Sequence, residues 1–377
     1  MRYIIFNPYG SPDRNPRVRR IEFLVNVLEE NKLPYLVINR HGSFTTLPNK
    51  TSSSVVPITI RKNNWFTNLI KKIVFPDYWV FWTIRKVFYY NFFLRQSDDI
   101  LITVSNPFSA HLLGLFVKSK RWIIDIGDLY TSNPHNQILQ GFWKNLAIGY
   151  EKTILCKADT IILNSKNVLD YYIKQYSLPK EKFHLIYNAN FLSFDFPPKT
   201  NSSQTVLAYF GSTFNSLRTA KEELIILQEL IKRNKKYTIY FIGNFHAEFI
   251  EFIKSNEFLA KQSQFGIAET DLQLQSYYRE VDILLNFSNG TYLGLQSKLV
   301  EYVQSGIAIL NFYTTTEEAS LDFLLDIEAT MNCNVNHYSI ESIELFIDEN
   351  KSKSTMRADH SNTQIAKQWQ ELLKPEK

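Results

Sequence analysis

A repeated order of elements constrains the fold more than any other feature of this chain. "RYIIF" at 2–6 predicts a buried strand, and after a turn-rich loop apolar residues recur at helical spacing over 17–32. "PYLVINR" at 34–40 then predicts a second strand, and strand, loop, helix, strand is the opening of a parallel α/β unit. Further strands are expected at 98–105, 121–127, 158–165 and 183–189, with helices between them.

A break in this pattern divides the chain. "SFDFPPKTNSSQ" at 193–204 holds two prolines and has no periodicity, which indicates a linker. Strands are expected again at 205–212, 237–244, 281–288 and 307–312. At 377 residues the chain also exceeds a typical single core. We therefore expect an α/β protein with two Rossmann-like parallel α/β domains, 1–195 and 196–357, facing a central cleft, and a C-terminal helix within 358–377 that packs back on the first domain.

Cysteine usage and hydropathy limit the cellular compartments in which this chain is expected. The two cysteines, Cys156 and Cys333, are far apart, so neither a disulfide framework nor a zinc site is expected. A reducing cytoplasm is the simplest location. The first apolar run is too short for a signal peptide, and no apolar stretch is long enough to span a bilayer.

The net charge of +5 is concentrated in one aromatic segment. Between Arg61 and Arg95 seven basic residues stand against one acid, Asp77, among twelve aromatic residues. The seven are Arg61, Lys62, Lys71, Lys72, Arg85, Lys86 and Arg95. Such a mixture suits an anionic membrane surface, and it also suits a buried aromatic helix with a solvated basic face. Nucleic acid is not expected as a partner, because the basic residues form no long stripe and no binding motif is present.

A glycine-serine loop follows the first strand of the second half. In "YFGSTFNSLR", Gly211 allows close approach of the backbone to a ligand, and Ser212 can donate hydrogen bonds. Arg218 is seven residues beyond Gly211, and its guanidinium suits phosphate oxygens. A tight turn with a solvated arginine is the alternative.

The second candidate lies in "SKLVEYVQSG". A helix is expected to begin near Gln296 or Ser297, where unpaired backbone N–H groups and the charge of Lys298 favour an anion. Glu301 is about one turn further, placed to accept hydrogen bonds from vicinal hydroxyls such as those of a ribose. An ordinary capped helix with surface charges is the alternative.

The first half offers three strand-end or helix-start candidates. Gly10 lies in the loop after the first strand, His111 at a helix start, and Asp128 just beyond the strand at 121–127. We expect Asp125, in the same stretch, to have a structural role. Asp128 is the better candidate for meeting a sugar, and His111 is a weaker one.

Taken together, these segments resemble bacterial family 4 glycosyltransferases of the GT-B fold, which build capsule, O-antigen and other surface polysaccharides. The resemblance runs over nearly the whole chain. It is carried by "NPYGSPDRNPRVRR", "SNPFSAHLLG", "IIDIGDLY", "ADTIILNS", "IYNAN", "YFGSTFNSLR", "YREVDILLNFS" and "SKLVEYVQSG". The last is similar to the frequent P-S-K-x-x-E-Y-x-x-x-G-x-P of that group.

The resemblance implies a retaining sugar transfer from a nucleotide-sugar donor, UDP- or GDP-linked, without metal or other cofactor. The acceptor would be a glycan or lipid-linked, held by domain 1–195, and the donor would bind domain 196–357. Glu301 resembles the second glutamate of the E-x7-E element, which holds the ribose. Arg218 and Gly10 fall where relatives approach the diphosphate, and Asp128 falls where many have a histidine near the transferred sugar. Asn188 lies in the segment that closes the first domain. The enzyme would lie in the cytoplasm, peripheral at the inner face of the membrane.

Several positions depart from the family pattern. Leu293 stands where the first glutamate of E-x7-E is expected, and Ser212 replaces a second basic residue. Gln296 and Ala308 replace the two prolines of the group's motif. Two alternatives stay open: a non-hydrolysing sugar-nucleotide epimerase, and a non-catalytic protein that binds a sugar nucleotide or glycan.

Overall fold

The computed structural model describes residues 1–10, 16–44, 74–133, 142–192, 194, 204–213, 218–290, 293–351 and 360–374. Four of the basic residues named above, Arg61, Lys62, Lys71 and Lys72, lie outside these ranges, as does most of the predicted linker at 193–204. The chain divides into two compact units. Unit 1 comprises Met1–Tyr187 and Ile365–Lys377, and unit 2 comprises Asn188–Gln364.

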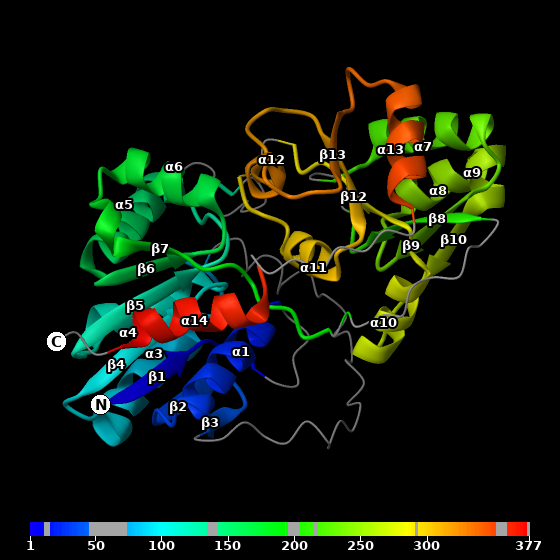
Figure 1. The fold of residues 1–377 in the computed structure, drawn as a ribbon. Helices are drawn as coiled ribbons and strands as arrows, with labels where there is room; N and C mark the ends of the chain where they lie inside the picture. The colour runs from blue at the N-terminus through cyan, green and yellow to red at the C-terminus, as the bar shows by residue number, and fades with distance from the viewer. Residues whose placement is uncertain are drawn as a thin grey trace. The chain divides into compact units, whose positions relative to one another are not determined.

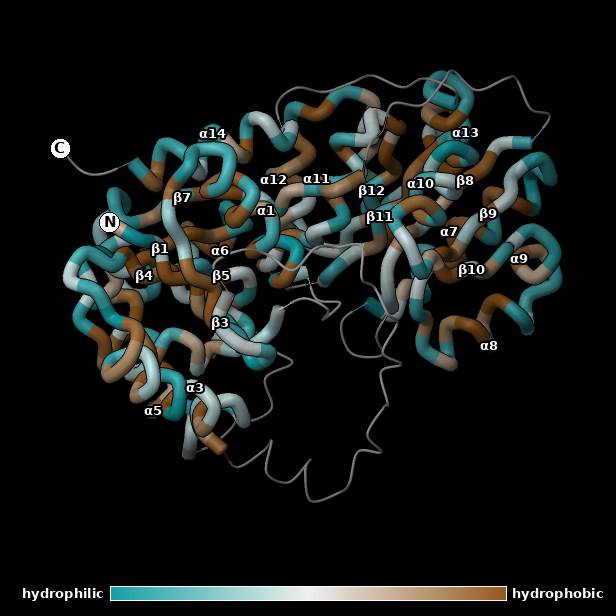
Figure 2. The backbone as a smooth tube through the Cα atoms, turned by 90° about the horizontal axis from the view of Figure 1, so that it is seen from below, coloured by the Kyte–Doolittle hydropathy of each residue, from teal (hydrophilic) through white to brown (hydrophobic). Residues whose placement is uncertain are grey.

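Unit 1 is built on a seven-stranded sheet of order β3-β2-β1-β4-β5-β6-β7 (Figure 1). Every neighbouring pair is parallel except β2 with β3, which is antiparallel. The strands are β1 (Arg2–Phe6), β2 (Tyr35–Asn39), β3 (Gly42–Phe44), β4 (Asp99–Val104), β5 (Arg121–Ile126), β6 (Thr160–Leu163) and β7 (Phe183–Leu185). The hydrophobic residues of this unit gather along β1, β4 and β5 (Figure 2).

The helices of unit 1 connect these strands in the right order for a parallel sheet. They are α1 (Pro16–Glu30), α3 (Val80–Tyr89), a π-helical turn η1 (Tyr90–Leu94), a 3₁₀ turn η2 (Phe108–His111), α4 (Leu112–Phe116), α5 (Phe142–Lys157), α6 (Lys166–Tyr176) and a 3₁₀ turn η4 (Lys180–Lys182). The C-terminal helix α14 (Asn362–Leu373) lies against this sheet. Tyr3 donates a hydrogen bond to the carbonyl of Leu373, and Arg121 Nη1 donates to that of Leu372 at 3.0 Å.

Unit 2 holds a six-stranded, all-parallel sheet of order β10-β9-β8-β11-β12-β13. The strands are β8 (Thr205–Phe210), β9 (Tyr237–Ile242), β10 (Ser263–Gly266), β11 (Ile283–Asn286), β12 (Ala308–Tyr313) and β13 (Thr330–Asn334). The helices are α7 (Lys221–Arg233), α8 (Ala247–Ser255), α9 (Glu257–Gln262), α10 (Asp271–Glu280), α11 (Ser297–Ser305), α12 (Ala319–Leu324) and α13 (Ile340–Asn350). The prediction of two parallel α/β domains is confirmed.

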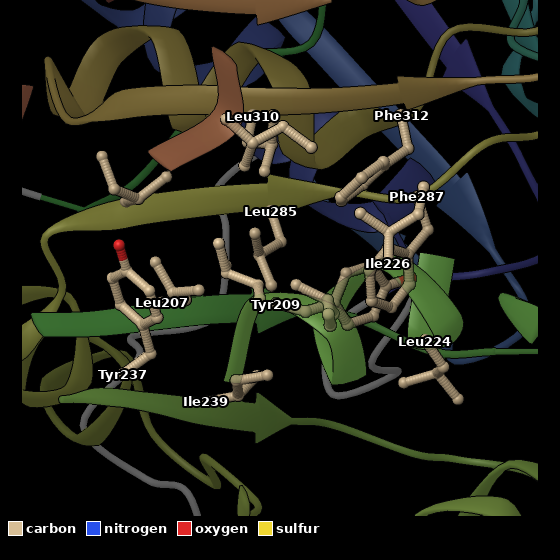
Figure 3. Close-up of a cluster of buried hydrophobic side chains, with 14 of the residues drawn as sticks. Leu207, Tyr209, Leu224, Ile226, Tyr237, Ile239, Leu285, Phe287, Leu310 and Phe312 are labelled. Atoms are coloured by element: carbon tan, nitrogen blue, oxygen red, sulfur yellow. The ribbon is translucent and has the colours of Figure 1, made fainter. Parts of the chain in front are cut away.

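One core cluster shows why the strands of unit 2 are so apolar. Side chains of β8, β9, β11 and β12 point into a common interior that α7 closes (Figure 3). Leu207 and Leu285 are fully buried there, and the ring of Tyr209 stacks on that of Phe287 at a centroid distance of 4.2 Å. A parallel sheet covered on both faces needs near-continuous apolar strands, and the same burial fixes where the strands end. Their carboxyl ends carry the residues considered next.

Candidate functional site

The turn after β8 depends on two glycines. Gly211 has φ +139°, a conformation that favours glycine, and its N–H donates to the carbonyl of Ile242 at 2.9 Å. Gly243, after β9, has φ +143°, and a Cβ there would lie 1.9 Å from the carbonyl oxygen of Gly211. The ends of β8 and β9 therefore hold each other through backbone contact, and the surface above Gly211 stays free of its own side chain.

Arg218 is fixed beside this turn by a set of oxygen acceptors. Its Nε donates to Asn289 Oδ1 at 3.1 Å, and its Nη2 donates to the same oxygen. Its Nη1 donates to the carbonyl of Ser212 at 3.0 Å and to the hydroxyl of Tyr209 at 3.3 Å. All of these acceptors are neutral, so the positive charge of Arg218 is held in place without a carboxylate partner among the contacts described here. The structure thus brings Ser212 and Arg218 together at the end of β8, as the sequence predicts.

Lys298 approaches the same turn from the first turn of α11. Its Nζ lies 3.4 Å from the ring centroid of Tyr209 and 3.6 Å from the position that a Cβ at Gly211 would occupy. The Nζ atom is buried and has no hydrogen-bond partner among the described residues. Burial and then the charge of Arg218 lower the pKa of Lys298 well below its ordinary range, while Glu301 raises it. An ammonium in this position gains from a bound anion.

The start of α11 leaves the backbone N–H groups of Ser297 and Lys298 available, whereas that of Leu299 donates to the carbonyl of Gln296 at 3.0 Å. Gln296 is the N-terminal cap residue with extended backbone, and its side chain does not cap the helix. Instead its buried amide donates to the carbonyl of Phe287 at 2.8 Å, which ties the helix start to the end of β11. Ser297 is the first helical residue and is exposed. The first N–H groups of a helix have no intrahelical acceptor, and they carry the positive end of the helix dipole.

Glu301 lies one turn further along α11. Its Oε1 accepts a hydrogen bond of 2.6 Å from the hydroxyl of Tyr278, which is almost fully buried. The Tyr278 ring stacks on Phe210, the last residue of β8, at a centroid distance of 4.2 Å. Burial, and then the nearby charge of Glu301, raise the pKa of Tyr278 well above its ordinary value. One carboxylate oxygen of Glu301 therefore already accepts a hydrogen bond from Tyr278, a contact that the sequence did not indicate.

Asn289 and Glu318 are positioning residues that the sequence analysis did not identify. Glu318 is almost fully buried. It accepts a hydrogen bond from the Ser288 hydroxyl at 2.6 Å and another from the backbone N–H of Asn289 at 2.9 Å. Glu223, also buried, accepts the N–H of Ser288 at 3.0 Å. The two carboxylates hold the loop after β11 in the conformation in which Asn289 Oδ1 accepts the hydrogen bonds from Arg218. An asparagine before Gly290 at a strand end was the only available signal.

Leu293, at the position of the missing glutamate, is partly buried. The two residues before it, 291–292, lie outside the described ranges. No carboxylate occupies that position, so the departure from the family pattern stands as the sequence shows it.

Of the remaining predicted residues, all except Asn188 belong to unit 1. Gly10 packs so tightly on Asn39 that a Cβ would lie 1.8 Å from the Asn39 amide nitrogen. Nearby, Asn7 Nδ2 donates to the carbonyls of Val104 and Asn106 at 2.6 and 3.2 Å, which links the ends of β1 and β4. Gly10 therefore has a packing reason for being glycine, besides any role in binding. Asn188, at the start of unit 2, is partly buried.

Asp128 lies beyond β5 and is about one third exposed at its side chain. Its Oδ2 accepts from Arg17 Nη2 and from Asn106 Nδ2, both at 3.1 Å. Gly127 makes the ion pair possible, because a Cβ there would lie 1.5 Å from the Arg17 guanidinium. Asp128 is thus an accessible carboxylate at the carboxyl edge of the sheet, held from two sides.

Asp125 has the structural role that was expected. It forms an ion pair with Arg20 at 2.6 Å, and both side chains are almost fully buried. Arg20 also donates to the carbonyl of Tyr187 at 3.0 Å, and its guanidinium lies 5.4 Å from the Trp369 ring centroid. This cluster ties α1, β5 and α14 together within unit 1.

The structure argues against a catalytic role for His111. The imidazole is fully buried, with Nδ1 2.8 Å from the Thr103 hydroxyl and the ring 4.9 Å from that of Phe108. Burial lowers the pKa of His111 to about 3, so the ring is neutral at physiological pH. A side chain without contact with solvent cannot meet a substrate in this conformation, and a helix-start histidine gave no sequence signal for its burial.

The described part of the chain shows neither a metal-binding cluster nor a membrane-spanning helix. Within the described residues, no group of three or more His, Cys, Asp or Glu side chains is placed to hold a metal ion. Metal independence itself stays a prediction. None of the described helices combines the length and the apolar character that crossing a membrane requires.

Neither a protein-family profile nor a curated protein matches this sequence. Solved structures do resemble it. Sucrose-phosphate synthase from Thermosynechococcus elongatus has a TM-score of 0.62 at 12% identity, covering 98% of this chain and 94% of its own. Anabaena Alr3699/HepE in complex with UDP has a TM-score of 0.59 at 13% identity, covering 99% of both chains.

A third similar structure differs in length. TarM has a TM-score of 0.53 at 14% identity over 76% of this chain, which spans only 54% of TarM. WaaG, described as a glycosyltransferase involved in lipopolysaccharide biosynthesis, aligns with a TM-score of 0.55 at 11% identity. At such identities the likeness establishes architecture alone, and on that basis the chain has the GT-B fold, with two Rossmann-like parallel α/β domains.

Proposed function

We propose that this protein is a glycosyltransferase that moves a sugar from a UDP- or GDP-sugar to a glycan or lipid-linked acceptor. The observation that carries the proposal is the buried, unpartnered ammonium of Lys298 beside Arg218 and beneath Gly211. Two cations at one turn, with no carboxylate ion-paired to either among the described residues, favour a ligand of at least two negative charges. A nucleoside diphosphate has that charge, and HepE, which shares the fold, was crystallised with UDP.

The roles of the residues follow from their positions. Lys298, Arg218 and the N–H groups at the start of α11 would stabilise the negative charge that builds on the departing diphosphate. These donors are already fixed by Tyr209, Asn289 and Gln296, so little reorganisation is needed as the charge develops. Glu301 would accept hydrogen bonds from the ribose hydroxyls. Asp128, a partly exposed carboxylate of unit 1, is proposed to face the sugar being transferred.

Finer features of the proposal come from the family resemblance. They are retention of configuration, independence from metal, and a role in bacterial surface polysaccharide synthesis. A location in the cytoplasm at the inner face of the membrane is proposed from the cysteine usage and the basic aromatic segment. Arg218 would compensate the anionic leaving group in place of a divalent cation. Activity that survives excess EDTA would support this feature, and activity restored only by added Mg²⁺ or Mn²⁺ would contradict it.

A ligand screen tests the proposal. Thermal shift and calorimetry with UDP-, GDP-, ADP- and CMP-sugars should give binding by one nucleotide class, with the free diphosphate binding more tightly than the monophosphate. Absence of binding by every nucleoside diphosphate would overturn the donor assignment.

Turnover then separates the alternatives. A glycosyltransferase needs an acceptor for transfer, whereas an epimerase converts the sugar of a UDP-sugar incubated alone. Binding without any turnover, across a panel of lipid-linked and soluble glycans, would favour a non-catalytic binding protein.

A further inference from the structure

A cluster of large apolar side chains faces outward on unit 1. Phe92 and Phe93 of η1 are each 75% exposed, and Phe81 of α3 is 68% exposed. We refer to the exposed apolar residues of α3, η1 and α4 as the aromatic face: Phe81, Ile84, Phe88, Phe92, Phe93 and Phe116. Isolated exposed apolar residues are common on soluble proteins, but a contiguous set this aromatic indicates an interaction surface.

The buried stripe of α3 fixes the direction of this face. Val80, Thr83 and Val87 are buried and recur at helical spacing, while Phe81, Ile84 and Phe88 recur at the same spacing one residue later. The helix therefore has two apolar stripes, and only one of them is needed by the core. Of the two interpretations left open by the sequence, a buried aromatic helix with a solvated basic face does not describe α3 and η1, since their solvated side carries phenylalanine rings.

Hydrogen bonds hold the end of α3 and η1 to the sheet. The Tyr90 hydroxyl, which is buried, donates to the carboxylate of Asp99, and Arg2 Nε donates to the same carboxylate at 3.0 Å. Since Asp99 begins β4, the aromatic face is presented on a rigid support. Because this support is rigid, a small movement would not bring the phenylalanine side chains of the aromatic face into the core.

The face extends from α3 onto α4. The two helices lie beside each other (Figure 1), and Asn91 Nδ2 donates to the carbonyl of Phe116 at 3.3 Å. Phe116 is 66% exposed at the end of α4. Phe116 therefore lies next to η1 as an exposed residue, although the two are more than twenty positions apart in the sequence.

Basic residues accompany these rings. Arg85, Arg95, Lys118 and Lys120 are exposed, and Lys86 is partly exposed with its Nζ 5.3 Å from the Tyr89 ring centroid. Burial, and then the charge of Arg85, lower the pKa of Lys86, but this does not neutralise the surface. Between 78 and 99 and between 112 and 120 the only other charged side chains are Asp98, which is exposed, and Asp99, which is paired with Arg2. The surface is cationic as well as aromatic.

We propose that the aromatic face docks on an anionic lipid bilayer, with the phenylalanine rings at the level of the headgroups and the basic side chains on lipid phosphates. Charge complementarity selects this occupant, because a second copy of the chain would bring the same cations face to face. A helix lying in the plane of an interface, with apolar rings toward the lipid and Lys and Arg around them, is the usual form of such binding. None of these residues belongs to the cluster around Lys298, so the inference stands or falls independently of the donor site.

Vesicle binding tests it directly. The purified full chain should co-sediment with vesicles that contain phosphatidylglycerol mixed into phosphatidylcholine. With vesicles of pure phosphatidylcholine, most of the protein should stay in the supernatant. Raising the salt concentration should weaken binding, since screening shortens the reach of each cation. Equal binding to both kinds of vesicle, or none to either, would overturn the proposal.

Two double variants and a matched control locate the surface. Phe92→Ser/Phe93→Ser should weaken vesicle binding about tenfold or more, because two exposed rings no longer enter the interface. Arg85→Gln/Arg95→Gln should weaken it about tenfold or more while reducing its salt dependence. Leu272→Ser/Leu325→Ser removes two residues of unit 2 that are 77% and 74% exposed, and it should bind as the natural chain does.

Two measurements distinguish lipid docking from misfolding and from self-association. The thermal midpoint and the affinity for a nucleoside diphosphate should be unchanged in all three variants, since every substituted side chain is exposed and none contacts Lys298. If sedimentation velocity in the absence of lipid shows a dimer that Phe92→Ser/Phe93→Ser dissociates, the surface is a contact between copies and the lipid proposal is wrong.

Discussion

The ammonium of Lys298 lies 3.4 Å from the ring centroid of Tyr209, with no hydrogen-bond acceptor among the described residues. A buried ammonium stabilised chiefly by an aromatic face is costly, because the ring replaces only part of the lost hydration. The folded protein therefore carries an unfavourable charge that a bound anion would relieve.

Replacing Lys298 with Met should lower nucleotide affinity without lowering stability. Met preserves most of the side-chain length while removing the buried charge, so the free energy of unfolding should be unchanged or higher by about 1 kcal/mol. Loss of a charged contact to phosphate should weaken binding of the nucleoside diphosphate about tenfold or more. Thermal melting and calorimetry measure the two effects. Lys254→Met, on the exposed side of α8, is the control, and parallel losses in both measurements would indicate a merely structural lysine.

Removing Asn289 should act through Arg218. Asn289→Ala deletes the oxygen that accepts from both Nε and Nη2 of the guanidinium, so we expect nucleotide affinity to fall about fivefold. The measurement is a double-mutant cycle by calorimetry. Asn289→Ala/Arg218→Ala should bind no worse than Arg218→Ala alone, and additive losses would show that Asn289 does not work through Arg218.

Glu301 requires a paired design, because its carboxylate is also the acceptor for Tyr278. Glu301→Ala leaves a buried hydroxyl without this acceptor, at a cost of about 1–3 kcal/mol in stability. Tyr278→Phe removes the same hydrogen bond from the other side and should keep nucleotide affinity. We therefore expect Tyr278→Phe/Glu301→Ala to recover part of the stability but to bind nucleotide as weakly as Glu301→Ala. Normal affinity in that double variant would exclude Glu301 as a ribose ligand.

Stability should depend on pH through Glu223. Burial raises the pKa of this carboxyl to about 7, from an ordinary value of 4.5 that the unfolded chain would show. Between these values the folded state holds the proton more tightly, so its contribution is fully present below about pH 4.5 and is lost as the pH rises toward 7. The change is on the order of 3 kcal/mol.

Denaturant titrations across pH 4.5 to 7 check this dependence. Glu223→Gln keeps an oxygen for the Ser288 N–H and should flatten the curve, whereas Glu248→Gln, at an exposed carboxylate of α8, should leave it unchanged. A natural protein with no loss of stability over this window would contradict the prediction.

Asp128 should matter for transfer and not for nucleotide binding. Asp128→Asn keeps an oxygen that can accept from Arg17 and Asn106, so the fold should tolerate it. If Asp128 faces the transferred sugar, the transfer rate should fall about a hundredfold while UDP or GDP affinity is retained. An unchanged transfer rate would remove Asp128 from the catalytic groups.

The sequence predicted those parts of the fold whose signal is local. β1 and β8 are dense apolar runs with turn formers after them, and the structure begins and ends them within two residues of the expected bounds. β10 and β13 were not predicted, because "SQFG" and "TMNCN" lack an apolar run and form strands only through pairing with β9 and β12. Tertiary context overrides propensity at such edge strands.

The candidate site likewise contains residues that the sequence could identify and contacts that it could not. Gly211, Arg218 and Lys298 could be named from strand-end loops and a helix start, since parallel topology gathers such residues at one edge. The grip of Asn289 on Arg218 joins residues 71 positions apart, and the burial of His111 depends on packing by Phe108. Neither contact leaves a periodic trace in the sequence.

Unit 1 is not continuous in the sequence, and this bears on how the protein is made. Ile365, Trp369 and Leu373 of α14 are buried in unit 1, although all of unit 2 is translated before them. While the ribosome is still synthesising unit 2, the first sheet therefore exposes the surface that α14 later covers, and Arg20 lacks its Trp369 neighbour. Completion of the first domain during biosynthesis must wait for the last helix, so the second domain has the first opportunity to finish folding.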